Sequence, residues 1–316
     1  MRAVTYLSCL LLAGAALPAA ARAASCNPAD DTLCLSLNRF QVEADWRTPD
    51  GEEGRGHAVQ LTSDTGTFWF FHPSNLEMVV KVLDACADPY HHFWVFAGGL
   101  TNVEVRLRVT DTATGAVRTY DNPMGREYAP ITDTAAFDTC GTGATTTPAA
   151  PPTTPTVVPA STPAAHPALG GNVLAGGPSD LPELTVADLP TAETATGEAT
   201  LGGMPTTMRL GRWGRFVVSL DWQGPNGEHG PAGAVQLSPD SGFLWFFSPQ
   251  NVEVAVKVLD ACDQHDTFWI FVSGMTNLGV RLTVRDDLTE EVKVYTSPVG
   301  EAFVPISDTA GLAVCP

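Results

Sequence analysis

The chain has 316 residues, a length that accommodates about two ordinary domains. Its 35 acidic residues against 17 basic ones give a formal net charge of −18. A field of that sign repels phosphate backbones and anionic lipid, which argues against a nucleic-acid partner. A hydrophobic share of 44% argues against wholesale disorder.

The first 23 residues have the pattern of a secretory signal peptide. Arg2 supplies the positive start, Ala3–Leu17 is largely apolar, and Ala21–Ala23 has the small-x-small form of a cleavage site. The apolar run is too short for a transmembrane segment, and we expect none elsewhere. Without Arg2 and Arg22, 15 basic residues face 35 acidic ones. We therefore expect a secreted protein, extracellular or periplasmic.

The chain repeats itself. An offset of 176 residues aligns the segment from Arg39 to Cys86 with the segment that ends at Cys262, and roughly half of the aligned positions are identical. After a one-residue gap, an offset of 175 continues the alignment from Phe93 to Cys140, which meets Cys315. Identity at this level predicts a duplicated domain.

Between the two copies lies a segment of different composition. Residues 141–207 begin with a stretch of Thr, Pro and Ala that has almost no large apolar side chains. Such a composition predicts an extended, semi-stiff tether, mostly disordered. We therefore expect a signal peptide at 1–23, a first domain at 24–140, a linker at 141–207 and a second domain at 208–316.

Six cysteines remain when Cys9 leaves with the signal peptide. An even number is expected to form disulfides in an oxidising compartment. The pair formed by Cys86 and Cys140 recurs in the second copy, so the simplest connectivity closes one bridge inside each copy. The prediction is therefore Cys26–Cys34, Cys86–Cys140 and Cys262–Cys315.

Short strands separated by turn residues fill the first copy. Phe40–Asp45 alternates apolar and polar side chains with a period of two, and no amphipathic helix interrupts the series. This pattern predicts an all-β fold with one antiparallel, Ig-like β-sandwich per copy; a small closed barrel is the alternative. The expected strands are Phe40–Asp45, Ala58–Leu61, Phe68–Phe71, Met78–Leu83, Phe93–Phe96, Val103–Val109 and Val117–Tyr120.

Three segments carry a resemblance: Gly66–Asp84, with the string FWFFHPSNLEMVVKVLD, then Phe93–Val103, and Asp133–Phe137. They resemble a tandem β-domain repeat module of secreted proteins from environmental bacteria, often found beside Pro/Thr linkers. The resemblance covers both copies and the prefix that holds Cys26 and Cys34. It implies the architecture and no particular activity.

Catalytic groups do not recur between the copies. No histidine or serine occupies matching positions; His57, for example, aligns with Gly233. We therefore expect no catalytic residues and no enzyme activity. His91 and His92 are adjacent and would point to opposite faces of a strand, so we expect no metal site there. Shared acids at strand ends keep calcium open as a cofactor, although none has the tight spacing of a calcium loop.

Aromatic residues offer the strongest binding candidates. Phe68–Phe71 and Phe93–Phe96 are apolar on both faces, whereas a two-layer sandwich covers only one face of each sheet. The tryptophans of these strands and of their repeats either form a platform for a sugar or protein, or lie under a lid formed by a following segment. These tryptophans are Trp69, Trp94, Trp245 and Trp269.

Four shared basic residues are the polar candidates: Lys81, Lys257, Arg106 and Arg281. Lys81 lies between Val80 and Val82 and should face away from the core, and Arg106 should do the same on its own strand. We expect Lys81 and Arg106 on one outer face, either in weak surface ion pairs or as a polar binding face.

These features favour a secreted, non-catalytic binding or structural protein with two tethered modules. Its expected partner is a polysaccharide or an extracellular protein. One alternative is an extracellular protease inhibitor that presents the Cys86–Phe93 loop. The other is a calcium-binding adhesion-type module.

Overall fold

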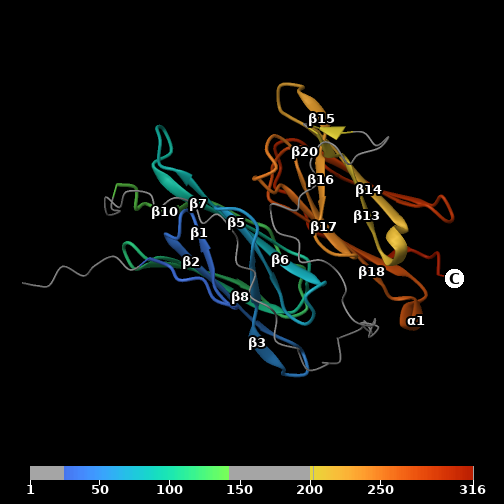
Figure 1. Ribbon diagram of the computed structural model, residues 1–316, viewed down its shortest axis with the longest axis horizontal. Helices are drawn as coiled ribbons and strands as arrows, with labels where there is room; N and C mark the ends of the chain where they lie inside the picture. The colour runs from blue at the N-terminus through green and yellow to red at the C-terminus, as the bar shows by residue number, and fades with distance from the viewer. Residues whose placement is uncertain (1–24, 142–199, 202, 316) are drawn as a thin grey trace, which may run out of the picture.

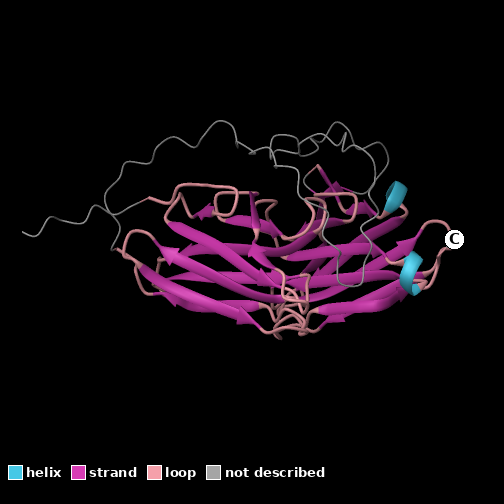
Figure 2. Ribbon diagram, turned by 90° about the horizontal axis from the view of Figure 1, so that it is seen from below, coloured by secondary structure: helices cyan, strands magenta, loops and turns pink. Residues whose placement is uncertain are grey.

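The structure, a computed structural model, describes residues 25–141, 200–201 and 203–315. We call residues 25–141 the N-terminal half and the described residues from 200 on the C-terminal half. The fold is all-β and β-sandwich-like, and the two halves lie side by side along the long axis (Figure 1, Figure 2). The expected signal peptide and nearly all of the expected linker lie outside the described residues.

The N-terminal half contains two antiparallel sheets. Along sheet 1 the strands follow the order β1, β2, β8, β9, with β3 also paired to β2; along sheet 2 the order is β10, β7, β6, β5, β4. The strands are β1 (Leu33–Leu35), β2 (Phe40–Arg47), β3 (Glu53–Arg55), β4 (His57–Gln60), β5 (Thr65–Trp69), β6 (Leu76–Ala85), β7 (His92–Gly99), β8 (Glu104–Asp111), β9 (Ala116–Asn122) and β10 (Ile131–Phe137).

The C-terminal half repeats this arrangement. Sheet 3 has the order β13, β14, β20, β21 with β15 paired to β14, and sheet 4 has the order β16, β17, β18, β19, β22. Its elements are β11 (Thr200–Leu201), β12 (Met204–Pro205), β13 (Thr207–Leu210), η2 (Arg212–Gly214), β14 (Phe216–Gln223), β15 (His229–Pro231), β16 (Gly233–Gln236), β17 (Ser241–Trp245), β18 (Val254–Asp260), α1 (Cys262–His265), β19 (Phe268–Gly274), β20 (Gly279–Asp286), β21 (Val292–Ser297) and β22 (Ile306–Leu312).

Each half has its own apolar core between its two sheets. Strand β2 buries every second residue, from Phe40 to Trp46, as its alternating sequence predicts. These side chains pack against residues of sheet 2 such as Phe68 and Val95, and the C-terminal half has a matching cluster around Phe216 and Ile270. Two separate sheets per half argue against the closed barrel.

Tyrosine–aspartate hydrogen bonds join the two sheets of each half. The Tyr120 hydroxyl on β9 donates to Asp133 Oδ2 on β10 at 2.9 Å, and Tyr295 on β21 donates to Asp308 Oδ2 on β22 at 2.8 Å. Partial burial and the adjacent carboxylate raise the pKa of both tyrosines. Both hydroxyls therefore stay protonated donors at neutral pH.

An arginine ties the end of each half together. Arg215 donates two hydrogen bonds to the buried carboxylate of Asp286, at 2.8 and 2.6 Å, and a third to the carbonyl of Val314 beside the last disulfide. Arg39 makes the equivalent contacts with Asp111 and with the carbonyl of Thr139. These pairs hold the last strand of each half against the first long strand.

The predicted disulfides are confirmed as Cys26–Cys34, Cys86–Cys140 and Cys262–Cys315. Each of the seven expected strands overlaps an observed one, although Phe70 and Phe71 lie beyond the end of β5. Strands β1, β3 and β10 were not expected. The last residues placed in the linker form β11, β12 and the start of β13.

Hairpin tips at the start of each half share an uncommon backbone. Leu37, between β1 and β2, has φ 58° and its side chain is 80% exposed. With the same 176-residue offset, Trp213 between β13 and β14 has φ 64° and is 89% exposed. Both are non-glycine residues in the left-handed region, which costs on the order of 1–3 kcal/mol.

Acid should weaken the C-terminal half through Asp286. Hydrogen bonds from Arg215 lower the pKa of Asp286 from 3.8 to about 2. A lowered folded-state pKa means that its stabilising contribution is present above pH 3.8 and is lost as the pH falls towards 2. We expect Asp286→Asn to destabilise the chain by about 3 kcal/mol at neutral pH and to flatten this acid transition, as measured by urea unfolding at a series of pH values.

The matched control is Asp121→Asn, which breaks the exposed ion pair with Arg106. It should cost less than about 1 kcal/mol. Equal losses for the two variants would contradict the structural role of the Arg215–Asp286 pair.

Candidate functional site

The outer faces of sheets 2 and 4 meet, and we call this interface the central contact. It is a third apolar cluster, separate from the two cores. Because the sheets of both halves contribute to it, the outer faces that the sequence left uncovered cover each other. Its buried members are Leu76, Val79, Leu100, Val235, Phe243, Trp245, Val252, Ala255 and Met275.

Two lysines cross the central contact in opposite directions. Lys81 Nζ donates to Asn251 Oδ1 at 2.6 Å and to the carbonyl of Val252 at 2.9 Å, and lies 3.9 Å from Glu253 Oε2. Lys257 Nζ lies 3.5 Å from Glu77 Oε2. Both lysine side chains are 3% exposed or less. Each half therefore places its cation against the carboxylate of the other.

Burial governs the electrostatics of these groups. It lowers the pKa of Lys81 and Lys257 and raises the pKa of Glu77, while the opposite charge across the contact acts against both changes. Lys81 Nζ also lies 5.3 Å from the centre of the Phe96 ring, a cation–π distance. Since an unpaired buried charge is costly, these pairs fix how the halves sit against each other.

The carboxylates of the central contact are held by neighbours in their own half. Asn75 donates from its side-chain amide to Glu77, and Asn251 donates to Glu253. Sequence reasoning did not select either asparagine, although each stands at a matching position two residues before the glutamate. The recurrence of an asparagine at this position in both copies could have identified the two residues from the sequence.

The four candidate tryptophans have two different environments. Trp69 and Trp245 are buried, at 7% and 4% exposure. Trp69 stacks on His57 with 3.8 Å between ring centres, and Trp245 belongs to the central contact. Neither Trp69 nor Trp245 faces solvent, so this pair offers no exposed platform.

The second pair, Trp94 and Trp269, is only partly buried. Trp94 lies between Tyr90 and Phe96, with ring centres 4.8 and 6.1 Å away. Trp269 lies between His265 and Phe271 in the same way. We call these sets the aromatic rows; each runs along one sheet towards the central contact, and Tyr90 is 56% exposed.

Lys81 and Arg106 do not share a face, contrary to expectation. Lys81 is on β6 of sheet 2, whereas Arg106 is on β8 of sheet 1, on the other side of the core. Arg106 Nε donates to Asp121 Oδ1 at 2.7 Å in an exposed pair. Arg281 is exposed on β20, opposite Asp221 in the strand register.

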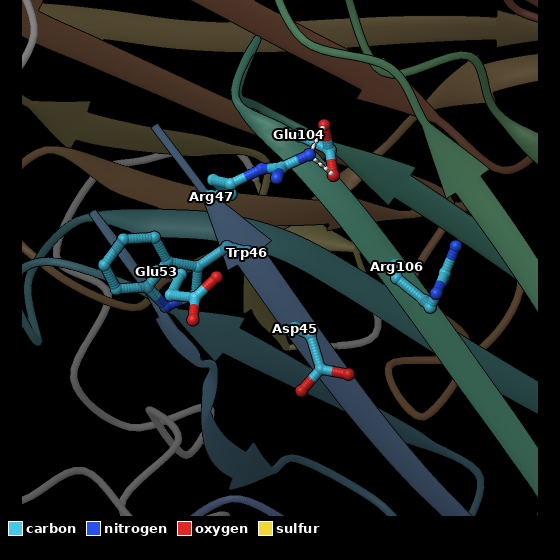
Figure 3. Close-up of a pocket in the computed structure, with 6 residues that line it drawn as sticks. All are labelled: Asp45, Trp46, Arg47, Glu53, Glu104 and Arg106. Carbon is cyan, nitrogen blue, oxygen red and sulfur yellow. Dashed lines mark hydrogen bonds and ion pairs between the residues drawn. The ribbon is translucent and has the colours of Figure 1, made fainter. Parts of the chain in front are cut away.

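A shallow depression of about 350 Å³ lies on sheet 1 near Arg106 (Figure 3). Arg47 reaches across to Glu104 with two contacts of 2.7 Å, so the main charges already neutralise each other. The corresponding place in the C-terminal half lacks the carboxylate of Glu104, because Gly279 occupies the matching position. The depression is lined by Asp45, Trp46, Arg47, Glu53, Glu104 and Arg106.

Three of the shared acids form internal pairs in both halves. Glu77, Asp111 and Asp133 bond to a lysine, an arginine and a tyrosine, and their repeats do the same. Within the described residues, no group of three or more His, Cys, Asp or Glu side chains is arranged to hold a metal ion. His91 instead pairs with Asp88 at 2.6 Å.

Comparison of the chain with protein-family models, with curated proteins and with solved structures finds no match. The fold defines the class: an all-β, β-sandwich-like protein with three disulfides. No helix in the described part of the chain is long and apolar enough to cross a membrane.

Removing one charge from the central contact should be more damaging than removing two. Lys257→Met leaves the Glu77 carboxylate buried without its cation, so we expect a loss of about 3–5 kcal/mol in the free energy of unfolding. Lys257→Met with Glu77→Gln removes both charges and should recover most of that loss. Urea unfolding followed by circular dichroism measures both.

Arg106→Met is the control, because its ion pair is exposed, and it should cost less than about 1 kcal/mol. A Lys257→Met loss as small as the Arg106→Met loss would show that the buried pair contributes little.

Proposed function

We propose that this chain is an exported, non-catalytic binding or structural protein built from two Ig-like β-sandwich domains that arose by duplication. Matching strand orders, matching Tyr–Asp bridges and one Cys–Cys staple at the same place in each half support the duplication. Three disulfides and the signal-like start of the chain support export.

One observation carries the non-catalytic part of the proposal: several ionisable groups that both halves share hold the fold together. The clearest case is the two lysines of the central contact: Lys81 pairs with Glu253, and Lys257 pairs with Glu77. All four side chains are buried there. A lysine used for catalysis would need access to a substrate. The repeated chemistry therefore serves packing.

For binding, the aromatic rows are the surfaces that remain. Each offers a partly exposed indole, Trp94 or Trp269, among further rings on the flat face of a sheet. Planar aromatic faces suit the apolar faces of sugar rings, which favours a polysaccharide as ligand. The chain would then carry two sites, one in each half, and binding at both raises avidity.

Substitution of the aromatic rows tests this. We expect soluble polysaccharides that bind the full chain to bind Trp94→Ala or Trp269→Ala about tenfold more weakly, a loss of about 1.4 kcal/mol per site, and the double variant not at all. Titration with a broad polysaccharide panel, followed by isothermal calorimetry, provides the measurement.

Trp213→Ala is the control, because this exposed indole lies on a hairpin tip outside both rows. Absence of binding across the whole panel would discard the polysaccharide as ligand. Binding that survives in the double variant would place the site elsewhere.

One specific observation favours the alternative function of a protease inhibitor. The loop between β6 and β7 starts at the Cys86–Cys140 bridge and presents Tyr90 with 56% of its surface exposed. The corresponding segment of the C-terminal half is the short helix α1, so only one half would inhibit.

Serine proteases that cleave after aromatic residues are the targets to assay. Inhibition by the full chain should be lost in Tyr90→Ala and kept in Trp213→Ala. Lack of inhibition of both serine and cysteine proteases would end this alternative.

A further inference from the structure

We propose that the central face of the N-terminal half is a recognition surface for a C-terminal half, whether that half belongs to the same chain or to a second copy, and that Gly98 and Ser273 restrict the pairing to unlike halves. The proposal rests on the structural role proposed above and adds the partner: a C-terminal half, of this chain or of another copy.

The polar contacts are reciprocal. Lys81 pairs with Glu253, and Lys257 pairs with Glu77; these are matching positions of the two halves. Exchanging the halves would therefore place a lysine and a glutamate at the same points. A contact with this two-fold character uses one face of each body and closes after two bodies have met.

The charges alone do not distinguish like from unlike pairs. Two N-terminal halves would also set Lys81 of one against Glu77 of the other. The remaining asymmetry must come from differences in side-chain size at the contact.

Gly98 on β7 and Ser273 on β19 supply that asymmetry. They are matching positions, yet they touch each other: a Cβ on Gly98 would lie 2.5 Å from Ser273 Oγ and 3.1 Å from Ser273 Cβ. Residues that match and touch lie at the axis of a two-fold contact. Ser273 is fully buried, so its hydroxymethyl group fills the space that the glycine leaves.

Like pairs would fit poorly at this point. Two C-terminal halves would bring two Ser273 side chains to a separation that does not admit even one added Cβ. Two N-terminal halves would oppose glycine to glycine and lose packing contacts. The pairing of unlike halves alone satisfies both the charges and the volume.

Each half also carries what it needs to stand as a separate body. Every disulfide of the described residues joins cysteines of one half, and each half has its own core. Residues 142–199 connect the halves, and 58 residues span at most about 200 Å. Pairing inside one chain is then favoured by effective concentration rather than by a different surface.

The first test uses the full chain with a protease site inserted between residues 142 and 199, cleaved without reductant. The two halves should co-elute in size-exclusion chromatography as a 1:1 complex. Gly98→Ser should weaken the complex at least tenfold, and Gly98→Ser with Ser273→Gly should restore it. Circular dichroism of each variant separates lost pairing from lost folding.

Gly230→Ser is the matched control, because a Cβ there meets only ordinary contacts, the nearest at 3.5 Å. Halves that keep their native spectrum but elute separately after cleavage would overturn the proposal. So would a Gly98→Ser variant that pairs as tightly as the parent chain.

The second test asks whether the partner can come from another chain. Cleaved unlabelled and ¹⁵N-labelled proteins are mixed, unfolded in urea with disulfides intact, refolded together and weighed by native mass spectrometry. About half of the 1:1 complexes should combine an N-terminal half of one label with a C-terminal half of the other. Only parental pairs, or pairs of like halves, would refute the proposal.

The outcomes are distinguishable from those of the proposed function. Polysaccharide binding reports on the aromatic rows and does not require cleavage or exchange. Pairing of the cleaved halves is measured without any ligand, so either result stands without the other.

Discussion

A lysine buried in an apolar contact must have an anionic or polar partner, and in this protein that partner is supplied by the other half of the chain. Lys81 and Lys257 would otherwise each leave a charge without water or counterion. When the apolar side chains of the outer faces of sheets 2 and 4 pack together, this requirement determines which residues must face each other. The aromatic rows keep partly exposed rings, whereas Trp245 of the same cluster is buried.

Within each half, hydrogen-bonded polar pairs hold neighbouring elements together at several places. The Tyr–Asp bridges join the two sheets, and Arg39 and Arg215 fasten the end of the last strand beside a disulfide. Because the same residues recur at matching positions of the two halves, we interpret these shared polar residues as a set that stabilises the fold. The proposed ligand would then be recognised by positions outside that set, where the halves differ or where an aromatic ring stays partly exposed.

The sequence was enough to predict seven strands of the N-terminal half, because they follow from local alternation. It also predicted the bridges, two from matching cysteines and the third from the pair that remained. It correctly turned Lys81 away from its own core. The alternation of apolar and polar residues along a strand does not show whether another sheet covers its outer face. The burial of Lys81 therefore could not be predicted from the sequence. Gly98 and Ser273 carried no signal because they differ, and β10 was missed because Ile131–Phe137 does not alternate large apolar side chains with polar ones.

The hairpin tips at Leu37 and Trp213 show what the two halves preserve. Leucine and tryptophan differ in size and shape, yet both occupy a left-handed backbone position and both extend into solvent. The two halves thus share the backbone conformation of this loop although the residue differs, and although glycine would adopt it at lower energy. Such a position tolerates variation in chemistry while its geometry stays constant, and it would accept a grafted residue without disturbing the strands on either side.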